Sequence, residues 1–181
     1  MAPELPEGER VVLREYRGED LNSVQRYAGD PEVTRYMIFG PNDRAETVAF
    51  LERVWVASRR DPRDQYEVAV VAKDNGELIG GARIGVLSFA HRKGDIGYVL
   101  RQDVWGRGIG TEIAGILLHF GFEVLRLHRI EATCDPRNVA SGRVLEKVGM
   151  QQEGLRRHDF LVRGQWRDSL LFSILESEWR R

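Results

Sequence analysis

The stretch Trp105-Gly-Arg-Gly-Ile-Gly-Thr111 is the most informative part of this chain. It places glycines at positions 106, 108 and 110, between an apolar segment typical of a strand and a long apolar segment typical of a helix. Glycine allows backbone conformations in which successive N–H groups point toward one place. A helix that begins near Thr111 adds unpaired N–H groups and the positive end of its dipole. The stretch therefore predicts a loop that binds a phosphate group.

Two familiar glycine loops fit this stretch poorly. A P-loop needs a Lys before the Ser or Thr that follows its last glycine, whereas Thr111 follows Gly110 directly. A dinucleotide loop, G-x-G-x-x-G, would need its third glycine at position 111. Glu131 does lie about where such a loop needs an acid to hold a ribose. However, a dinucleotide loop begins almost at the end of its strand, and residues 101–105 separate Leu100 from Gly106. These spacings disfavour a dinucleotide site.

Three motifs in order along the chain resemble the GCN5-related N-acetyltransferase (GNAT) superfamily. They are Gly94-Asp-Ile-Gly-Tyr-Val-Leu100, the glycine loop at 105–111, and Asn138-Val-Ala-Ser-Gly-Arg-Val-Leu-Glu-Lys-Val-Gly149. The segments 10–14, 19–21 and 30–36 are similar to the start of the RimJ/RimL-type branch, which acetylates N-terminal amines of ribosomal proteins. The resemblance covers nearly the whole chain. It implies an α/β (α+β) fold with a central mixed, mostly antiparallel twisted sheet of six to seven strands, flanked by helices and with a splayed strand pair for acyl-CoA.

Composition and length are typical of one globular domain over residues 1–181, because 181 residues with 42% hydrophobic side chains suit a single core. The 27 Lys and Arg nearly balance the 28 Asp and Glu, so no basic field favours nucleic acid as a partner. Cys134 is the single cysteine, and we find no leader-like segment or apolar run of 18 residues. We therefore expect a cytoplasmic protein without a membrane span. The four His residues lie at no ligand spacing, so no metal is implied.

Hydrophobic periodicity and turn residues predict the elements. Asn42 or Asp43 should cap a helix that ends before a polar stretch at residue 58, and Asp74-Asn75-Gly76 should form a hairpin turn. A second hairpin should turn at Arg163-Gly164-Gln165. We expect the other helices at 19–27, 111–124 and 138–148, and strands at 11–14, 66–72, 78–87, 95–100, 129–134, 155–162 and 166–175.

The resemblance implies acetyl transfer from acetyl-CoA to a primary amine, which attacks the thioester carbon directly. It assigns the pyrophosphate to the glycine loop, where Arg107 adds charge, and the pantetheine arm and thioester oxygen to the end of the preceding strand. Asn138 would also contact the pantetheine arm. The cofactor-binding set is thus Val99, Leu100, Arg101, Gly106, Arg107, Gly108, Gly110, Thr111, Asn138 and Ser141.

Two residues are candidates for proton transfer. Asp95, on a strand that faces the cleft, would take the ammonium proton directly or through a water, although a solvated Asp at a strand edge has the same appearance. Glu67 on a neighbouring strand is a weaker alternative. Many superfamily members protonate the thiolate with a Tyr at the position of Leu145, and Ser141 is the expected substitute. Asn138 and Ser141 also suit a helix N-cap and first turn.

Tyr36 and Phe39 are expected walls of the acceptor site, although an exposed aromatic loop would look the same. Three functions remain open. The favoured acceptor is the α-amine of a protein or peptide, and the alternatives are a small amine (polyamine, aminoglycoside or amino acid) or a noncatalytic acyl-CoA sensor. The chain is expected to act as a monomer or homodimer, and the acyl-chain preference stays open.

Overall fold

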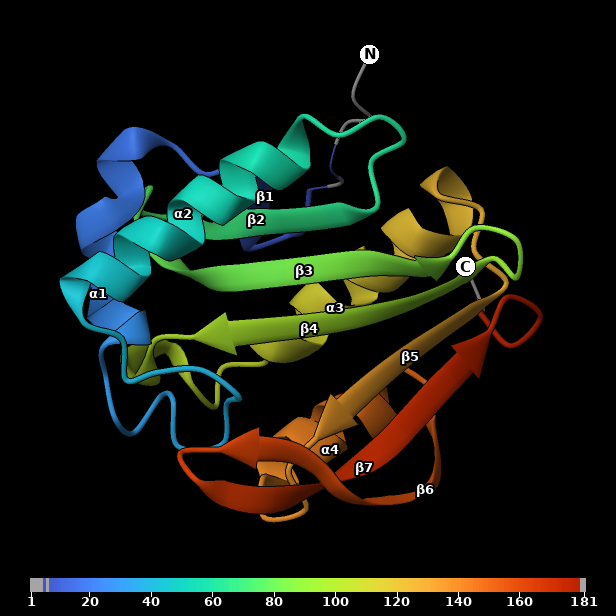
Figure 1. Cartoon of the computed structure of the whole chain (residues 1–181). Coiled ribbons are helices and arrows are strands. Elements are labelled where there is room, and N and C mark those ends of the chain that lie inside the picture. The colour runs from blue at the N-terminus through green and yellow to red at the C-terminus, as the bar shows by residue number, and fades with distance from the viewer. Residues whose placement is uncertain (1–4, 6, 180–181) are drawn as a thin grey trace.

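The computed structural model describes residue 5 and residues 7–179. The predicted domain at 1–181 therefore includes residues 1–4, 6 and 180–181, which lie outside the described residues. A seven-stranded sheet in the order β1-β2-β3-β4-β5-β7-β6 forms the centre, with helices on both faces (Figure 1). Only the β4–β5 pair is parallel among the described strand pairs, and the other neighbours are antiparallel. The predicted fold class, an α/β arrangement around a mostly antiparallel sheet, is confirmed.

The observed elements follow the predicted order. The strands are β1 Val11–Arg14, β2 Gln65–Ala72, β3 Leu78–Ser88, β4 Lys93–Leu100, β5 Arg129–Cys134, β6 Gln151–Val162 and β7 Gln165–Leu175. The α-helices are α1 Leu21–Ala28, α2 Arg44–Ser58, α3 Ile109–His119 and α4 Val139–Lys147. Short 3₁₀ turns lie at η1 Gly18–Asp20 and η2 Gln102–Val104, and a π-helical turn lies at η3 Phe120–Val124.

Helix ends show where local sequence was sufficient and where it was not. Asp43 caps α2 as predicted, because its carboxylate accepts from the Glu46 N–H while the Glu46 carboxylate accepts from the Asp43 N–H, both at 2.8 Å. The helix predicted at 111–124 instead begins at Ile109 and passes into the π-turn after His119. Gly121 lies in that turn, where a Cβ atom would be 2.5 Å from Ile130 on the sheet. The change from α-helix to π-turn thus coincides with close packing of Gly121 on the sheet. The apolar periodicity of the sequence did not predict it.

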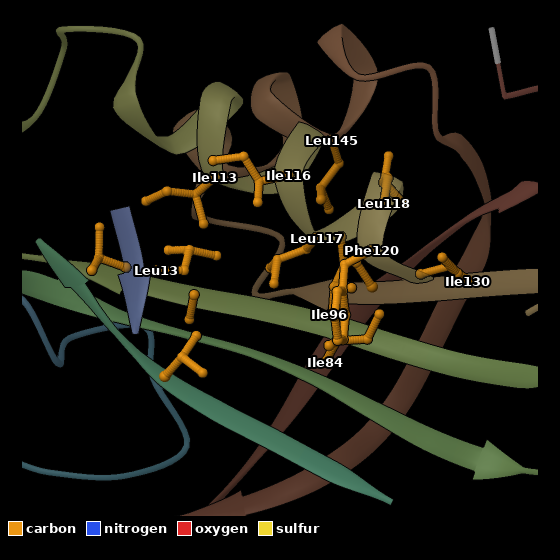
Figure 2. Close-up of a cluster of buried hydrophobic side chains, with 14 of the residues drawn as sticks. Leu13, Ile84, Ile96, Ile113, Ile116, Leu117, Leu118, Phe120, Ile130 and Leu145 are labelled. Carbon is orange, nitrogen blue, oxygen red and sulfur yellow. The ribbon is translucent and has the colours of Figure 1, made fainter. Parts of the chain in front are cut away.

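Two hydrophobic clusters lie on opposite faces of the sheet. On one face α3 and the π-turn η3 pack with Ile113, Leu117 and Phe120 almost fully buried, and Leu145 of α4 joins them (Figure 2). On the other face α1 and α2 cover the half of the sheet that includes β2 and β3. Burial of these apolar side chains fixes both layers to the sheet.

The pairing of β4 with β5 is short, and the place where it ends defines the site. Only Lys93–Arg129, Gly94–Ile130 and Asp95–Glu131 are matched, after which the strands diverge (Figure 1). Parallel strands need a crossover, and here it runs through the glycine loop and α3. The carboxyl ends of β4 and β5 therefore stand apart, beside the start of α3. Within the described part of the chain, no helix is both long and apolar enough to span a membrane.

Candidate active site

The glycine loop joins the end of β4 to α3 and leaves backbone donors unpaired. Gly106 and Gly108 have φ values of 74° and 77°, in the left-handed region that favours glycine. Gly108 is the N-cap of α3, and no described side chain caps the helix. The first helical bond runs from the Glu112 N–H to the Gly108 carbonyl at 3.2 Å, so the N–H groups of 109–111 lack helical acceptors. The residues present therefore fit an anion such as a pyrophosphate.

Gly110 has an additional role that the sequence did not reveal. A Cβ atom at this position would lie 3.1 Å from the ring of Tyr98 on β4. The absence of a side chain at Gly110 thus lets the first turn of α3 pack directly on that ring. Thr111 follows in the same turn, and the Arg107 side chain is exposed.

Arg10 braces the glycine loop from the start of β1. Its backbone N–H and its Nε donate to the two carboxylate oxygens of Glu112, each at 2.7 Å, and its Nη1 donates to the carbonyl of Arg107. Burial acts to raise the pKa of Glu112, but the hydrogen bonds from Arg10 hold that pKa below its ordinary value. The contact of Arg10 with the loop is not evident from the sequence, because Arg10 precedes the loop by almost a hundred residues. The one indication of a cation at this place is the acidic residue in the first turn of α3, Glu112.

Strand register decides which backbone N–H groups at the end of β4 face the place where β4 and β5 diverge. The Arg101 N–H donates to the Ile79 carbonyl of β3 at 2.8 Å, and its side chain pairs with Asp103 and Glu77. Alternate residues of an antiparallel pair face the same neighbour, so Val99 also points its N–H toward β3. The backbone N–H groups of Leu100 and Tyr98 point toward β5 instead. The N–H donors that face the diverging strands are therefore those of Tyr98 and Leu100, not those of Val99 and Arg101.

Trp105 stabilises the conformation of this strand end. Its indole Nε1–H donates to the Leu100 carbonyl at 2.9 Å, and the rest of the ring is partly exposed. Leu100 lies beyond Asp95, the last residue of β4 that pairs with β5. Its carbonyl therefore has no donor on β5, and Trp105 supplies one.

Ser141 lies where β4, β5 and α4 meet. The Asn138 carboxamide oxygen accepts from the Ser141 N–H at 3.2 Å, so Asn138 is the N-cap of α4. The Ser141 hydroxyl is a neighbour of the Tyr98 and Cys134 side chains and interacts electrostatically with both. Burial raises the pKa of Tyr98 to about 12 and that of Cys134 to about 11, and in each case the Ser141 hydroxyl acts in the opposite direction. Both groups therefore stay protonated near neutral pH.

Tyr98 is the second residue that the sequence analysis missed. Its position in Gly94–Leu100 was part of the motif, but a single Tyr on a buried strand gives no signal for a contact with α4. Leu145, at the position of the usual tyrosine acid, is buried in the core and labelled there in Figure 2. Ser141 and Tyr98 are therefore the hydroxyl groups that the fold brings to this place.

Asp95 lies at the last paired position of β4, where the strands begin to diverge. Arg83 of β3 donates to its two carboxylate oxygens at 2.8 and 2.9 Å, and the Asp95 side chain is 24% exposed. Glu67 is the β2 partner of Arg83 and lies on the same face of the sheet. Burial raises the pKa of Glu67, while Arg83 and Arg53 act to lower it. The fold thus brings the two candidate bases together around one guanidinium.

Glu131 faces Asp95 across the β4–β5 pair and has a different role. Its carboxylate is 7% exposed and pairs with Lys93 at 2.8 Å, Arg129 at 2.9 Å and Arg156 at 3.4 Å. Burial acts to raise the pKa of Glu131, but these cations, chiefly Lys93 and Arg129, hold it below its ordinary value. Glu131 is therefore a buried counter-ion in the sheet rather than a ribose ligand.

The two expected acceptor residues lie on the loop between α1 and α2. The guanidinium of Arg35 is 5.2 Å from the centre of the Tyr36 ring, and that of Arg137 is 5.8 Å away. Phe39 instead packs against the cluster under α1 and α2. Across residue 5 and residues 7–179, no three His, Cys, Asp or Glu side chains gather in a way that could hold a metal ion.

Comparison with known families adds to this geometry. Residues 10–151 match the family model described as an acetyltransferase (GNAT) domain, which covers most of the chain. The uncharacterised N-acetyltransferase YnaD of Bacillus subtilis is 31% identical over 94% of this chain and 96% of its own length. The spermidine N(1)-acetyltransferase of Escherichia coli is 26% identical over 97% of this chain and 91% of its own.

One further relative and one solved structure complete the comparison. The [ribosomal protein uS5]-alanine N-acetyltransferase of Escherichia coli is 30% identical over 59% of this chain and 55% of its own length. The solved structure of Mycobacterium smegmatis RimJ in complex with CoA-disulfide superposes with a TM-score of 0.83 at 29% identity, covering 94% of this chain and 84% of that one. The relatives thus include acetyltransferases with different acceptors.

Proposed function

Because this chain belongs to the GNAT acetyltransferase family, we propose that its acetyl acceptor is the α-amine of a protein or peptide N-terminus. The chain is an N-acetyltransferase, and acetyl-CoA is the acetyl donor in this family. The proposal adds the acceptor, the roles of individual residues and the extent of the domain, which we take to be the whole of residues 1–181.

The observation that carries the choice of acceptor is the pairing of three carboxylates, those of Asp95, Glu131 and Asp135, on the diverging strands β4 and β5 and directly after β5. Asp95 is held by Arg83, Glu131 by Lys93 and Arg129, and Asp135 by Arg137. A polyamine carries several positive charges and needs unpaired carboxylates to hold the ammonium groups that do not react. Those three acids are already neutralised, which supports an acceptor with one reactive amine.

The donor's place follows from the unpaired backbone groups. We assign its pyrophosphate to the N–H groups of Gly106, Arg107, Gly108, Gly110 and Thr111, with charge from the Arg107 guanidinium. Its pantetheine arm and thioester carbonyl are assigned to the N–H groups of Leu100 and Tyr98 and to the Asn138 carboxamide. The left-handed glycines and the direction of the β4 backbone support these roles.

Asp95 is proposed as the group that receives the ammonium proton, through a water or directly, with Arg83 fixing its orientation. Its place where β4 and β5 begin to diverge supports this role, and Glu67 is the alternative. The donor supplies a thioester whose C–S bond breaks as the amine nitrogen bonds to the acetyl carbon. Ser141 is proposed to donate a hydrogen bond to the sulfur that leaves, supported by Tyr98 behind it.

The experiment that tests this proposal is thiol release from acetyl-CoA with an Ala-initiated peptide, the same peptide with a blocked N-terminus, spermidine and an aminoglycoside. We expect turnover with the free peptide and none with its blocked form. Turnover with spermidine alone would favour the small-amine alternative, which the 26% identity to a spermidine acetyltransferase motivates. Tight acetyl-CoA binding without any turnover would favour the acyl-CoA sensor.

A cytoplasmic location is proposed together with this chemistry. The single cysteine, Cys134, is a buried free thiol, which is compatible with a reducing compartment. A monomer or homodimer remains the expected assembly, and analytical ultracentrifugation would distinguish the two.

A further inference from the structure

The β6–β7 hairpin contacts the loop between α1 and α2, although more than a hundred residues separate them in sequence (Figure 1). Arg163 lies at the hairpin turn with a φ of 51°. Its Nε donates to the Gly40 carbonyl at 2.8 Å, and its Nη2 donates to the carbonyls of Thr34 at 3.0 Å and Phe39 at 3.1 Å. One guanidinium therefore ties together both ends of the segment 34–40.

Arg167 makes a second connection two strand positions beyond the turn. Its Nη1 donates to the Arg35 carbonyl at 2.9 Å and lies 3.9 Å from the Asp135 carboxylate, and its side chain is 17% exposed. Asp135 follows β5 and is buried, and the hydrogen bonds from Arg137 hold its pKa below its ordinary value despite that burial. Arg167 thus links the loop to the carboxyl end of β5, where that strand has diverged from β4.

These bonds determine the conformation of the loop. The backbone hydrogen bonds of the segment form single turns, such as those from the Thr34 N–H to the Asp30 carbonyl and from the Met37 N–H to the Thr34 carbonyl, both at 3.0 Å. Isolated turns of this kind hold a loop weakly, because each fixes several dihedral angles for one bond. Bonds from a guanidinium are stronger than neutral ones, and the planar fork holds several acceptors in fixed directions.

We propose that Arg163 and Arg167 are positioning residues that hold the α1–α2 loop as one wall of the acceptor site. The loop carries Tyr36, and the two arginines act on the acceptor through the loop rather than by contact. Acceptor affinity then depends on them, whereas acetyl-CoA binding, which uses the glycine loop and β4, does not. This inference rests on the function proposed above.

The first test compares wild type, Arg163→Lys and Arg167→Lys in acetylation of the Ala-initiated peptide. Lysine keeps the charge but has no planar fork. We expect the KM for the peptide to rise about tenfold with kcat changed less than about threefold, the pattern of lost binding shared by ground and transition states. The acetyl-CoA Kd, measured by calorimetry, should stay unchanged. An unchanged peptide KM, or a matching loss of acetyl-CoA affinity, would overturn the inference.

The second test needs no acceptor. Hydrogen exchange of residues 34–40 in the enzyme alone should become faster in Arg163→Lys and Arg163→Gln than in wild type. Arg59→Lys is the matched control, because Arg59 is exposed at the end of α2 and its side chain makes no hydrogen bond with the described residues. Unchanged exchange at 34–40 would reject the inference. If wild type acetylates no amine, the proposed function fails, and the exchange result still decides whether the arginines hold the loop.

Discussion

Arg83 holds both carboxylate oxygens of Asp95, at 2.8 and 2.9 Å, at the residue where β4 and β5 cease to pair. The guanidinium fixes the orientation of the carboxylate, and its neighbour Glu67 faces the same cation from β2. The candidate proton acceptor is thus one member of a charged group that spans three strands, rather than an isolated acid.

Asp95→Asn should lower kcat/KM by about 10²-fold, because the amide keeps the shape of the carboxylate but cannot accept the ammonium proton. Steady-state kinetics between pH 6 and about pH 9 provide the measurement, and acetyl-CoA affinity serves as the control. Glu67→Gln should retain most of the activity. A large loss in Glu67→Gln together with a near-normal Asp95→Asn would transfer the role of base to Glu67.

Ser141→Ala should lower kcat by about 10²-fold, since it removes the hydroxyl proposed to stabilise the departing sulfur. Tyr98→Phe should give a smaller loss, because Tyr98 acts through Ser141. The pKa of Tyr98 is raised to about 12, so it stays a protonated donor across the assay range and its loss should not shift the alkaline limb of the rate profile. Stopped-flow detection of thiol release measures both effects. A Ser141→Ala enzyme with full kcat would show that the thiolate leaves without this donor.

Gly108→Ala should weaken acetyl-CoA binding about tenfold, because a side chain at positive φ costs roughly 1–2 kcal/mol and moves the loop away from its anion-binding conformation. Gly76→Ala is a matched control. Gly76 has a φ of 71° against 77° for Gly108, and it lies in the β2–β3 turn. Both variants should lose stability, and only Gly108→Ala should lose affinity by calorimetry. Equal affinities for the two variants would contradict the assignment of the loop.

Glu131→Gln should lower the free energy of unfolding by about 2 kcal/mol at pH 7, because it leaves Lys93 and Arg129 without their buried partner. The pKa of Glu131 is depressed in the folded chain, so its contribution is present above the unfolded value, near pH 4.3, and is lost as the pH falls through the folded value. Urea unfolding at pH 7 and at about pH 4 should show the difference shrinking at the lower pH. Glu19→Gln, on an exposed carboxylate, should change little at either pH.

Local sequence patterns were sufficient for most of the elements. The alternation of apolar residues predicted the seven strands, although β4 and β6 begin at Lys93 and Gln151, earlier than expected. The Asp43 cap and the glycines at 106 and 108 were recognisable because caps and positive φ angles depend on residues next to one another. The order of motifs along the chain then indicated the family.

Contacts between distant segments were not predictable in the same way. Arg10 and Glu112, Arg83 and Asp95, and Arg163 and Gly40 meet only when the sheet has assembled. Strand register also decided which backbone N–H groups face the diverging strands, since a shift of one residue reverses every direction. The direction of the N–H groups of Tyr98, Val99 and Arg101 therefore follows from the register and from no local pattern in the sequence.

The sequence by itself determined the order of elements and the glycine loop, because each depends on residues within a few positions of one another, and the order of its motifs indicated an N-acetyltransferase. The tertiary structure alone decided which carboxylate meets which guanidinium, which side chains surround Ser141 and what holds the loop between α1 and α2. These outcomes depend on packing of α3 against the sheet and on the divergence of β4 from β5, where burial and long-range pairing select among side chains that look equivalent in the sequence.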